Sequence, residues 1–275
     1  MDIVSVAALL LVGMASAVFG SIVGLGGGVI IVPTLMLGGQ WLTGEPVSAP
    51  TAVGTSLAVL IFTALSSTMT YARLGTVDWK SGWLFFITSG PAAMGGARWA
   101  NTVSDGPFQL AFGCFILLMF GLMVARERFK PLNIRWPITR SFRDRAGNVY
   151  SYGYNAWSAL LIGAGVGFVS GLFGIGGGSL FVPLMVLLYR FPPHVATATS
   201  MFVILLSSIS GSGMHLWDGN IEPVMLLALA PGALLGGRLG ARIAARLSGP
   251  QLMWLLRMTL LAMAIYLIFQ GIRSM

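Results

Sequence analysis

The chain has 275 residues, of which 56% are hydrophobic and only 9% are charged, and its mean hydropathy is +0.85. Soluble domains carry about 25% charged residues, so a soluble fold could not cover this much apolar surface. The net charge of +8 comes with one cysteine, Cys114, and two histidines, which excludes an intrachain disulfide and disfavours a metal site.

Stretches with few or no charged residues divide the chain into ten apolar segments, five in each half. They fall at 3–23, 29–42, 50–71, 79–98 and 106–125, and then at 155–173, 179–189, 195–215, 221–240 and 251–272. A helix needs about 20 residues to span the bilayer, and the second segment of each half is too short. We therefore expect an all-α polytopic membrane protein in which the first two segments of each half form a helical hairpin, broken or re-entrant.

Two sequence blocks recur in the same order in the two halves. Residues 24–33 read Gly-Leu-Gly-Gly-Gly-Val-Ile-Ile-Val-Pro, residues 174–183 read Gly-Ile-Gly-Gly-Gly-Ser-Leu-Phe-Val-Pro, and a Thr-Ser pair follows each block. This order predicts a duplicated chain. The predicted divisions are a first transmembrane repeat (1–125), a basic linker (126–154) and a second transmembrane repeat (155–275).

The charged loops predict how the chain crosses the membrane. Seven of the 16 basic residues lie in one connecting loop: Arg126, Arg128, Lys130, Arg135, Arg140, Arg143 and Arg145. The positive-inside rule places this loop in the cytoplasm, and no motif framework for base contact accompanies it, so nucleic acid is not an expected partner. Corresponding loops of the halves carry opposite charge bias, which predicts inverted repeats with both termini outside.

The glycine blocks are the first part of a candidate binding site. Glycine runs before short helices present backbone N–H groups at helix N-termini, where the helix dipole attracts anions. The Thr-Ser pairs add hydroxyl groups from the next helix of each half. The candidate substrate-binding residues are Gly26, Gly27, Gly28, Thr55, Ser56, Gly176, Gly177, Gly178, Thr199 and Ser200. The open alternative is that the glycines serve only close helix crossing and that the hydroxyls bond their own backbone.

The absence of acidic residues inside the predicted spans, and of catalytic residue sets, disfavours some classes of transporter and enzyme. No carboxylate lies inside a predicted span, since Glu222 is at the outer end of segment 221–240, and this disfavours a cation site or an acidic proton relay. No catalytic set and no metal-ligand spacing is present, so we expect neither an enzyme nor a cofactor. His215, at the outer end of its segment, is expected at the membrane interface.

The doubled Gly-x-Gly-Gly-Gly-x4-Pro blocks, each followed by Ala-x-x-Thr-Ser, resemble the sulfite exporter TauE/SafE family of bacterial inner-membrane proteins. The resemblance implies export of sulfite, a sulfonate or a related anion, with a small anionic substrate and the lipid bilayer as partners. A homodimer and a monomer both stay open. Two alternatives also stay open: a membrane assembly subunit that transports nothing, and a proton- or cation-coupled carrier of another solute.

Overall fold

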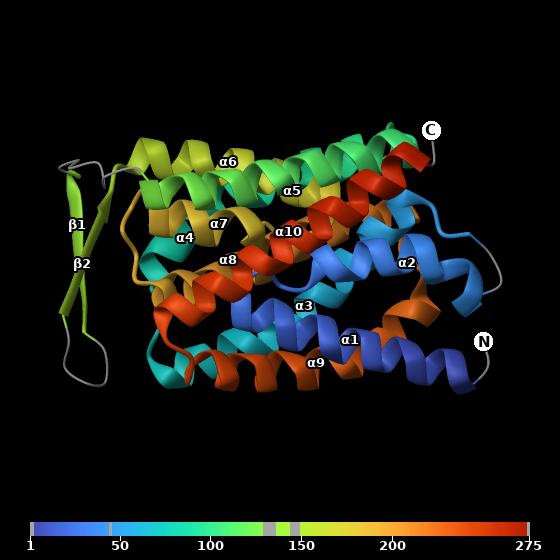
Figure 1. The fold of residues 1–275 in the computed structure, drawn as a ribbon, viewed down its shortest axis with the longest axis horizontal. Coiled ribbons are helices and arrows are strands. Elements are labelled where there is room, and N and C mark those ends of the chain that lie inside the picture. Colours follow the sequence, from blue (N-terminus) through green and yellow to red (C-terminus); the bar gives the residue numbers. More distant parts are fainter. Residues whose placement is uncertain (1–2, 44–45, 129–135, 144–148, 274–275) are drawn as a thin grey trace.

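The computed structural model describes residues 3–43, 46–128, 136–143 and 149–273 (Figure 1). Within these ranges each predicted apolar segment forms a helix. The helices are α1 (Ile3–Val23), α2 (Gly28–Thr43), α3 (Ala49–Leu74), α4 (Trp79–Ala100), α5 (Asp105–Arg128), α6 (Ala156–Phe173), α7 (Gly178–Leu187), α8 (Pro193–Trp217), α9 (Pro223–Ala244) and α10 (Gly249–Arg273). The predicted all-α fold is confirmed.

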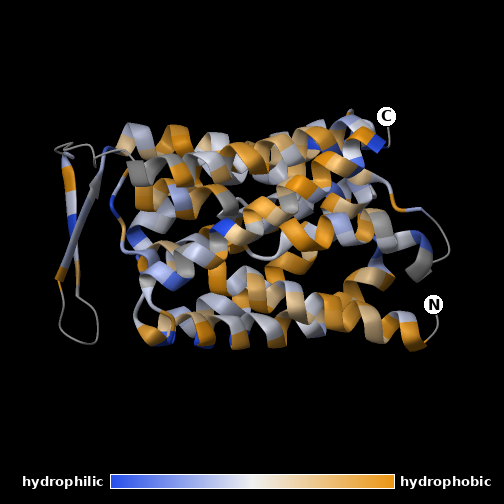
Figure 2. Cartoon of the chain, viewed as in Figure 1, coloured by the Kyte–Doolittle hydropathy of each residue, from blue (hydrophilic) through white to orange (hydrophobic). Residues whose placement is uncertain are grey.

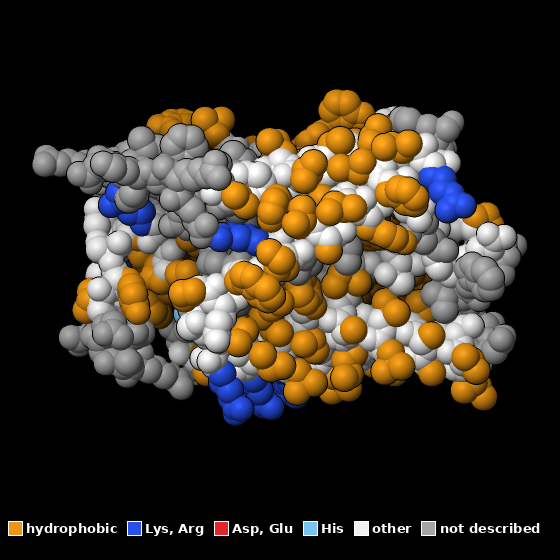
Figure 3. All heavy atoms as spheres, in the orientation of Figure 1, with side chains coloured by type: hydrophobic (Ala, Val, Ile, Leu, Met, Phe, Trp, Pro, Cys, Tyr) orange, Lys and Arg blue, Asp and Glu red, His pale blue; other side chains and the backbone are white. Residues whose placement is uncertain are grey.

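The outer surface of the helices is apolar, as expected of a polytopic membrane protein. Within the described residues, five helices are long and apolar enough to cross a bilayer: α1, α3, α6, α8 and α9. Large hydrophobic side chains such as Trp157, Leu161 and Leu227 are about three-quarters exposed. Hydrophobic side chains spread over most of the face that Figure 3 shows. Hydrophobic residues continue along most of the helices (Figure 2). Lipid is the solvent that such a surface requires.

Helices of the first half pair with helices of the second half. Helix α1 packs along α9, α4 along α6, α3 along α8 and α5 along α10. Small residues bring the backbones together, because a β-carbon at Gly167 of α6 would overlap the Ser89 carbonyl of α4. On the opposite side, a β-carbon at Gly236 of α9 would overlap the Met14 carbonyl of α1. The two halves are therefore interleaved rather than separate bodies.

Each half begins with a helical hairpin that enters and leaves at the same end of the molecule. Helix α1 starts at the end that holds both termini, and α2 returns to that end (Figure 1). Helix α6 starts at the opposite end, and α7 returns there. At about 1.5 Å per residue, α2 and α7 are both shorter than the roughly 30 Å hydrocarbon core. Both contain a proline, Pro33 or Pro183, which removes one helix hydrogen bond.

A β-hairpin lies in the segment that we predicted to be a connecting loop. Strand β1 (Ile138–Arg143) pairs antiparallel with β2 (Val149–Tyr154), with Ile138 opposite Tyr154. The hairpin stands across one end of the helices, which we call the hairpin end, opposite the terminal end that holds both termini (Figure 1). Alternating tyrosines in Val-Tyr-Ser-Tyr-Gly-Tyr are a strand signal that the sequence analysis missed.

Candidate functional site

The two glycine blocks form turns that touch each other between the halves. A β-carbon at Gly28 would overlap the Gly174 carbonyl, and one at Gly178 would overlap the Gly24 carbonyl. Gly27 and Gly177 have φ angles of +101° and +74°, a region that other residues rarely adopt. These positions therefore accept only glycine, both for their backbone conformation and for the contact between the turns.

Each turn leads directly into a short helix at the centre of the fold. The Gly27 carbonyl accepts hydrogen bonds from the N–H groups of Ile30 and Ile31, and the Gly177 carbonyl accepts them from Leu180 and Phe181. The N–H groups in the first turn of a helix have no partner within the helix. The buried N-termini of α2 and α7 thus lie beside each other, and their dipoles favour negative charge.

The two candidate serines join the turns to the opposite half of the chain. Ser56 of α3 donates its hydroxyl hydrogen to the Gly174 carbonyl at 2.8 Å. Ser200 of α8 donates to the Gly24 carbonyl at 3.1 Å and to the Thr197 carbonyl at 2.8 Å. Both serines are fully buried. Their donors are already used, so in this conformation the serines hold the glycine turns in place.

The two candidate threonines face away from the glycine turns, toward the starts of α4 and α9. The Thr199 hydroxyl accepts a hydrogen bond from the Asp78 N–H at 3.0 Å, and the Thr55 hydroxyl accepts one from the Glu222 N–H, also at 3.0 Å. Both threonines are fully buried. Among the described residues no group accepts their hydroxyl hydrogens. These two hydroxyls keep a donor that a ligand could use.

Leu60 of α3 and Ile204 of α8 close the space beside the glycine turns. A β-carbon at Gly26 would lie 2.9 Å from Leu60 Cδ2 and 3.4 Å from Ile204 Cγ2. At Gly176 the corresponding distances are 2.9 Å to Leu60 Cδ1 and 2.8 Å to Ile204 Cγ2. Both side chains are fully buried. The structure therefore brings the ten candidate residues into one buried region but separates the threonines from the turns, with apolar side chains at the centre.

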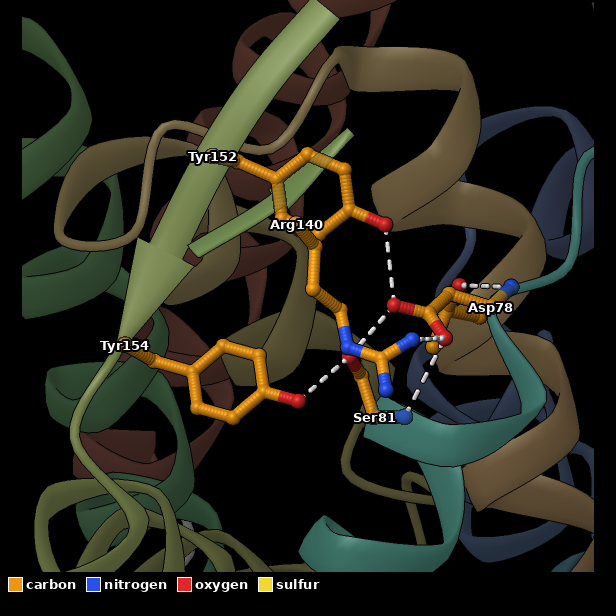
Figure 4. A network of polar contacts seen from close by, with 6 residues as sticks. Asp78, Ser81, Arg140, Tyr152 and Tyr154 are labelled. Atoms are coloured by element: carbon orange, nitrogen blue, oxygen red, sulfur yellow. Dashed lines mark hydrogen bonds and ion pairs between the residues drawn. The ribbon is translucent and has the colours of Figure 1, made fainter. Parts of the chain in front are cut away.

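Asp78 is a polar residue of this region that the sequence analysis missed. It is the N-cap of α4, and its carboxylate contacts Ser81, Arg140 and Tyr152 (Figure 4). The sequence around Asp78 gave no sign of these contacts, because Arg140 and Tyr152 are more than 60 residues away in the sequence. His215, which we expected at the membrane interface, is fully buried beside Gly54 at the last turn of α8.

Comparison with known proteins agrees with this architecture. The family described as "Sulfite exporter TauE/SafE" matches residues 9–267. The chain belongs to the TauE/SafE family. A relative from Bacillus subtilis, "Probable membrane transporter protein YunE", is 44% identical over 97% of this chain and 98% of its own length. A "Probable membrane transporter protein" from Xylella fastidiosa is 27% identical over 96% of this chain and 94% of its own.

Membership of the TauE/SafE family and the names of these relatives indicate a membrane transporter rather than an enzyme. No solved structure matches the chain significantly. Among the described residues, no three His, Cys, Asp or Glu side chains lie together in a way that could hold a metal ion. The donors of the candidate site are N–H and O–H groups, which suit an anionic ligand.

Proposed function

We propose that the protein exports a small sulfur-containing anion, such as sulfite or a sulfonate, across the bacterial inner membrane. The observation that supports this most strongly is the contact between the two glycine turns, each at the buried N-terminus of a short helix. Two helix dipoles whose positive ends meet favour negative charge at one place in the fold. Such a site requires no acidic side chain and no metal ion.

The substrate path would run through the candidate region by alternating access of two inverted repeats. Leu60 and Ile204 close the centre in the present conformation, so an anion reaches the turns only after these side chains separate. The hydroxyls of Thr55 and Thr199 lie toward the terminal end and the hairpin end respectively. Each threonine would meet the anion when its own end is open.

The charges at the two ends support a cytoplasmic hairpin end. The described residues at the hairpin end include Arg73, Lys80 and Arg242 besides Asp78, whereas the terminal end has Asp105, Asp218 and Glu222 besides Arg98 and Arg273. Basic loops stay in the cytoplasm, so both termini would lie outside. An interior-negative membrane potential then drives an anion outward, at about 2.3 kcal/mol per charge per 100 mV. Export would need no strong coupling ion.

Ligand-dependent thermal stability of the purified protein tests this proposal. We expect sulfite or methanesulfonate to raise the melting temperature, whereas chloride at the same ionic strength leaves it unchanged. A protein that only assembles with another subunit would respond to none of these salts. Stabilisation by sodium or by protons, and not by the sulfur anions, would instead indicate a cation-coupled carrier.

A further inference from the structure

The Asp78 carboxylate links the hairpin to the helices. It accepts hydrogen bonds from the Ser81 backbone N–H at 3.2 Å and from the Ser81 hydroxyl. The hairpin adds the Tyr152 hydroxyl of β2 at 2.8 Å and Arg140 Nη1 of β1 at 3.3 Å (Figure 4). Burial, and then the charge of Asp78, raise the pKa of the Tyr152 phenol above its ordinary value, so the phenol remains a donor at neutral pH.

Asp78 also connects the hairpin to the candidate site, because its backbone N–H donates to Thr199. The matching residue at the terminal end is Glu222, whose N–H donates to Thr55. In the described parts of the chain, however, no hydrogen bond or ion pair involves the Glu222 carboxylate. The two ends thus share one N–H to threonine contact, and among the described residues the β-hairpin adds side-chain contacts to it at the hairpin end.

The hairpin rests on the helices through aromatic contacts and a few polar ones. The Tyr152 ring lies 4.0 Å from the Phe191 ring, centre to centre, and the Gly153 N–H donates to the Tyr189 carbonyl at 3.2 Å. The Tyr154 hydroxyl lies 2.9 Å from the Ser81 hydroxyl. These contacts all lie at the connection between α7 and α8 or at the start of α4. The Tyr154 ring also packs against Phe85 of α4, and β2 leads into α6, so this end of β2 stays on the helices while the part of the hairpin that holds Arg140 and Tyr152 can lift.

Arg140 is the most loosely held member of this network. The Arg140 side chain is 28% exposed, compared with 7% for Asp78, and its one polar contact among the described residues, at 3.3 Å, is longer than a strong charge-assisted hydrogen bond. The buried Arg140 Nε has no partner among the described residues. A guanidinium group can bind two oxygens of an anion side by side. Loss of Arg140 would leave Tyr152 as the hairpin's remaining donor to Asp78, and after the hairpin lifts Asp78 still keeps the N–H and the hydroxyl of Ser81 as donors.

We propose that the hairpin β1–β2 is a gate over the hairpin end of the transport path, that Asp78 is its latch, and that an incoming oxyanion opens it by taking Arg140 from Asp78. The last step rests on the proposed function. Lifting of the hairpin uncovers the start of α4 and, beneath it, Thr199. The latch itself does not depend on which solute is carried.

Hydrogen–deuterium exchange of the backbone of 149–154 in the full purified protein tests the gate. Tyr152→Phe keeps the ring on Phe191 and removes one of the hairpin's two donors to Asp78, and Arg140→Gln removes the guanidinium group that is the second. Each change should speed exchange of this segment by about tenfold, as expected for the loss of a hydrogen bond to a charged group. Arg242→Gln, which removes an exposed charge at the same end, is the matched control and should leave exchange unchanged.

Methanesulfonate, compared with chloride at equal ionic strength, tests the role of Arg140. It should speed exchange of 149–154 in the wild-type protein and in Arg242→Gln, but not in Arg140→Gln. Arg140→Lys keeps the charge without the side-by-side geometry and should respond more weakly than the wild type, which covers the case in which Arg140→Gln does not fold.

Three results would overturn parts of this proposal. Unchanged exchange in both Tyr152→Phe and Arg140→Gln would overturn the latch. Methanesulfonate that stabilises the protein but affects wild type and Arg140→Gln alike would overturn the role of Arg140 and leave the proposed function standing. If methanesulfonate neither stabilises the protein nor changes exchange, both the substrate class and the role of Arg140 are overturned. The effect of Tyr152→Phe on exchange would still test the latch.

Discussion

Replacing Thr199 with valine removes the acceptor of the Asp78 N–H and keeps the shape of the side chain. Thr199 is fully buried, so the N–H would be left without a partner at a cost of about 1–3 kcal/mol in the free energy of unfolding. If the Thr199 hydroxyl also donates to the anion, affinity should fall about 10- to 100-fold, as for a lost hydrogen bond to a charged group. Denaturant unfolding and anion binding are measured on the same purified samples.

Thr197 provides the matched control two residues earlier on α8. It is 1% exposed, and its hydroxyl has no hydrogen-bond partner among the described residues. Thr197→Val should therefore leave stability unchanged or raise it, because it removes an unpaired buried hydroxyl. Equal stability of the two variants would refute the Asp78–Thr199 hydrogen bond. Unchanged anion affinity in both Thr55→Val and Thr199→Val would remove the threonines from the proposed site.

Three other experiments test the packing, the central closure and the orientation. Gly178→Ala would place a methyl group against the Gly24 carbonyl and should lower the free energy of unfolding by about 1–3 kcal/mol or more. The control Gly165→Ala, whose methyl group would point into open space in α6, should leave the free energy of unfolding unchanged or raise it by up to about 1 kcal/mol. Thermal unfolding of both variants compares them. Leu60→Ala should lower the free energy of unfolding by about 2–5 kcal/mol, because Leu60 is fully buried. It should also increase the leak of anions from liposomes that contain the protein, and an unchanged leak would argue against a central closure. With the native cysteine replaced by serine, a cysteine at Ser141 should be shielded from impermeant thiol reagents in intact cells and one at Asn220 should react; the reverse labelling would invert the proposed orientation.

The helices could be predicted from the sequence because each depends on a local property, a run of apolar residues bounded by charged or turn-forming ones. The predicted segment 79–98, for example, became α4, which extends from Trp79 to Ala100. The helical hairpins followed from the glycine blocks and from the short segments after them. For these helices and hairpins, the composition of one continuous segment determines the structure.

The partners of the candidate residues could not be predicted, because they come from distant parts of the chain. Ser56 bonds a carbonyl at Gly174, and Thr199 bonds the N–H of Asp78. We expected both hydroxyls of each Thr-Ser pair to face the same site, but neighbouring residues on a helix point in directions about 100° apart. The serines therefore reach the glycine turns while the threonines reach the starts of other helices. The hairpin was not predicted, because the basic charge of the linker indicated a cytoplasmic loop, whereas its alternating tyrosines indicated a strand.

Anion efflux from liposomes tests the central claim most directly. Purified protein is reconstituted into liposomes loaded with sulfite or methanesulfonate, and an interior-negative potential is imposed. The account predicts saturable efflux of the sulfur anion that depends on the protein, grows with the potential and is lost in Gly178→Ala. Efflux no faster than from protein-free liposomes, with the protein folded and inserted, would contradict it.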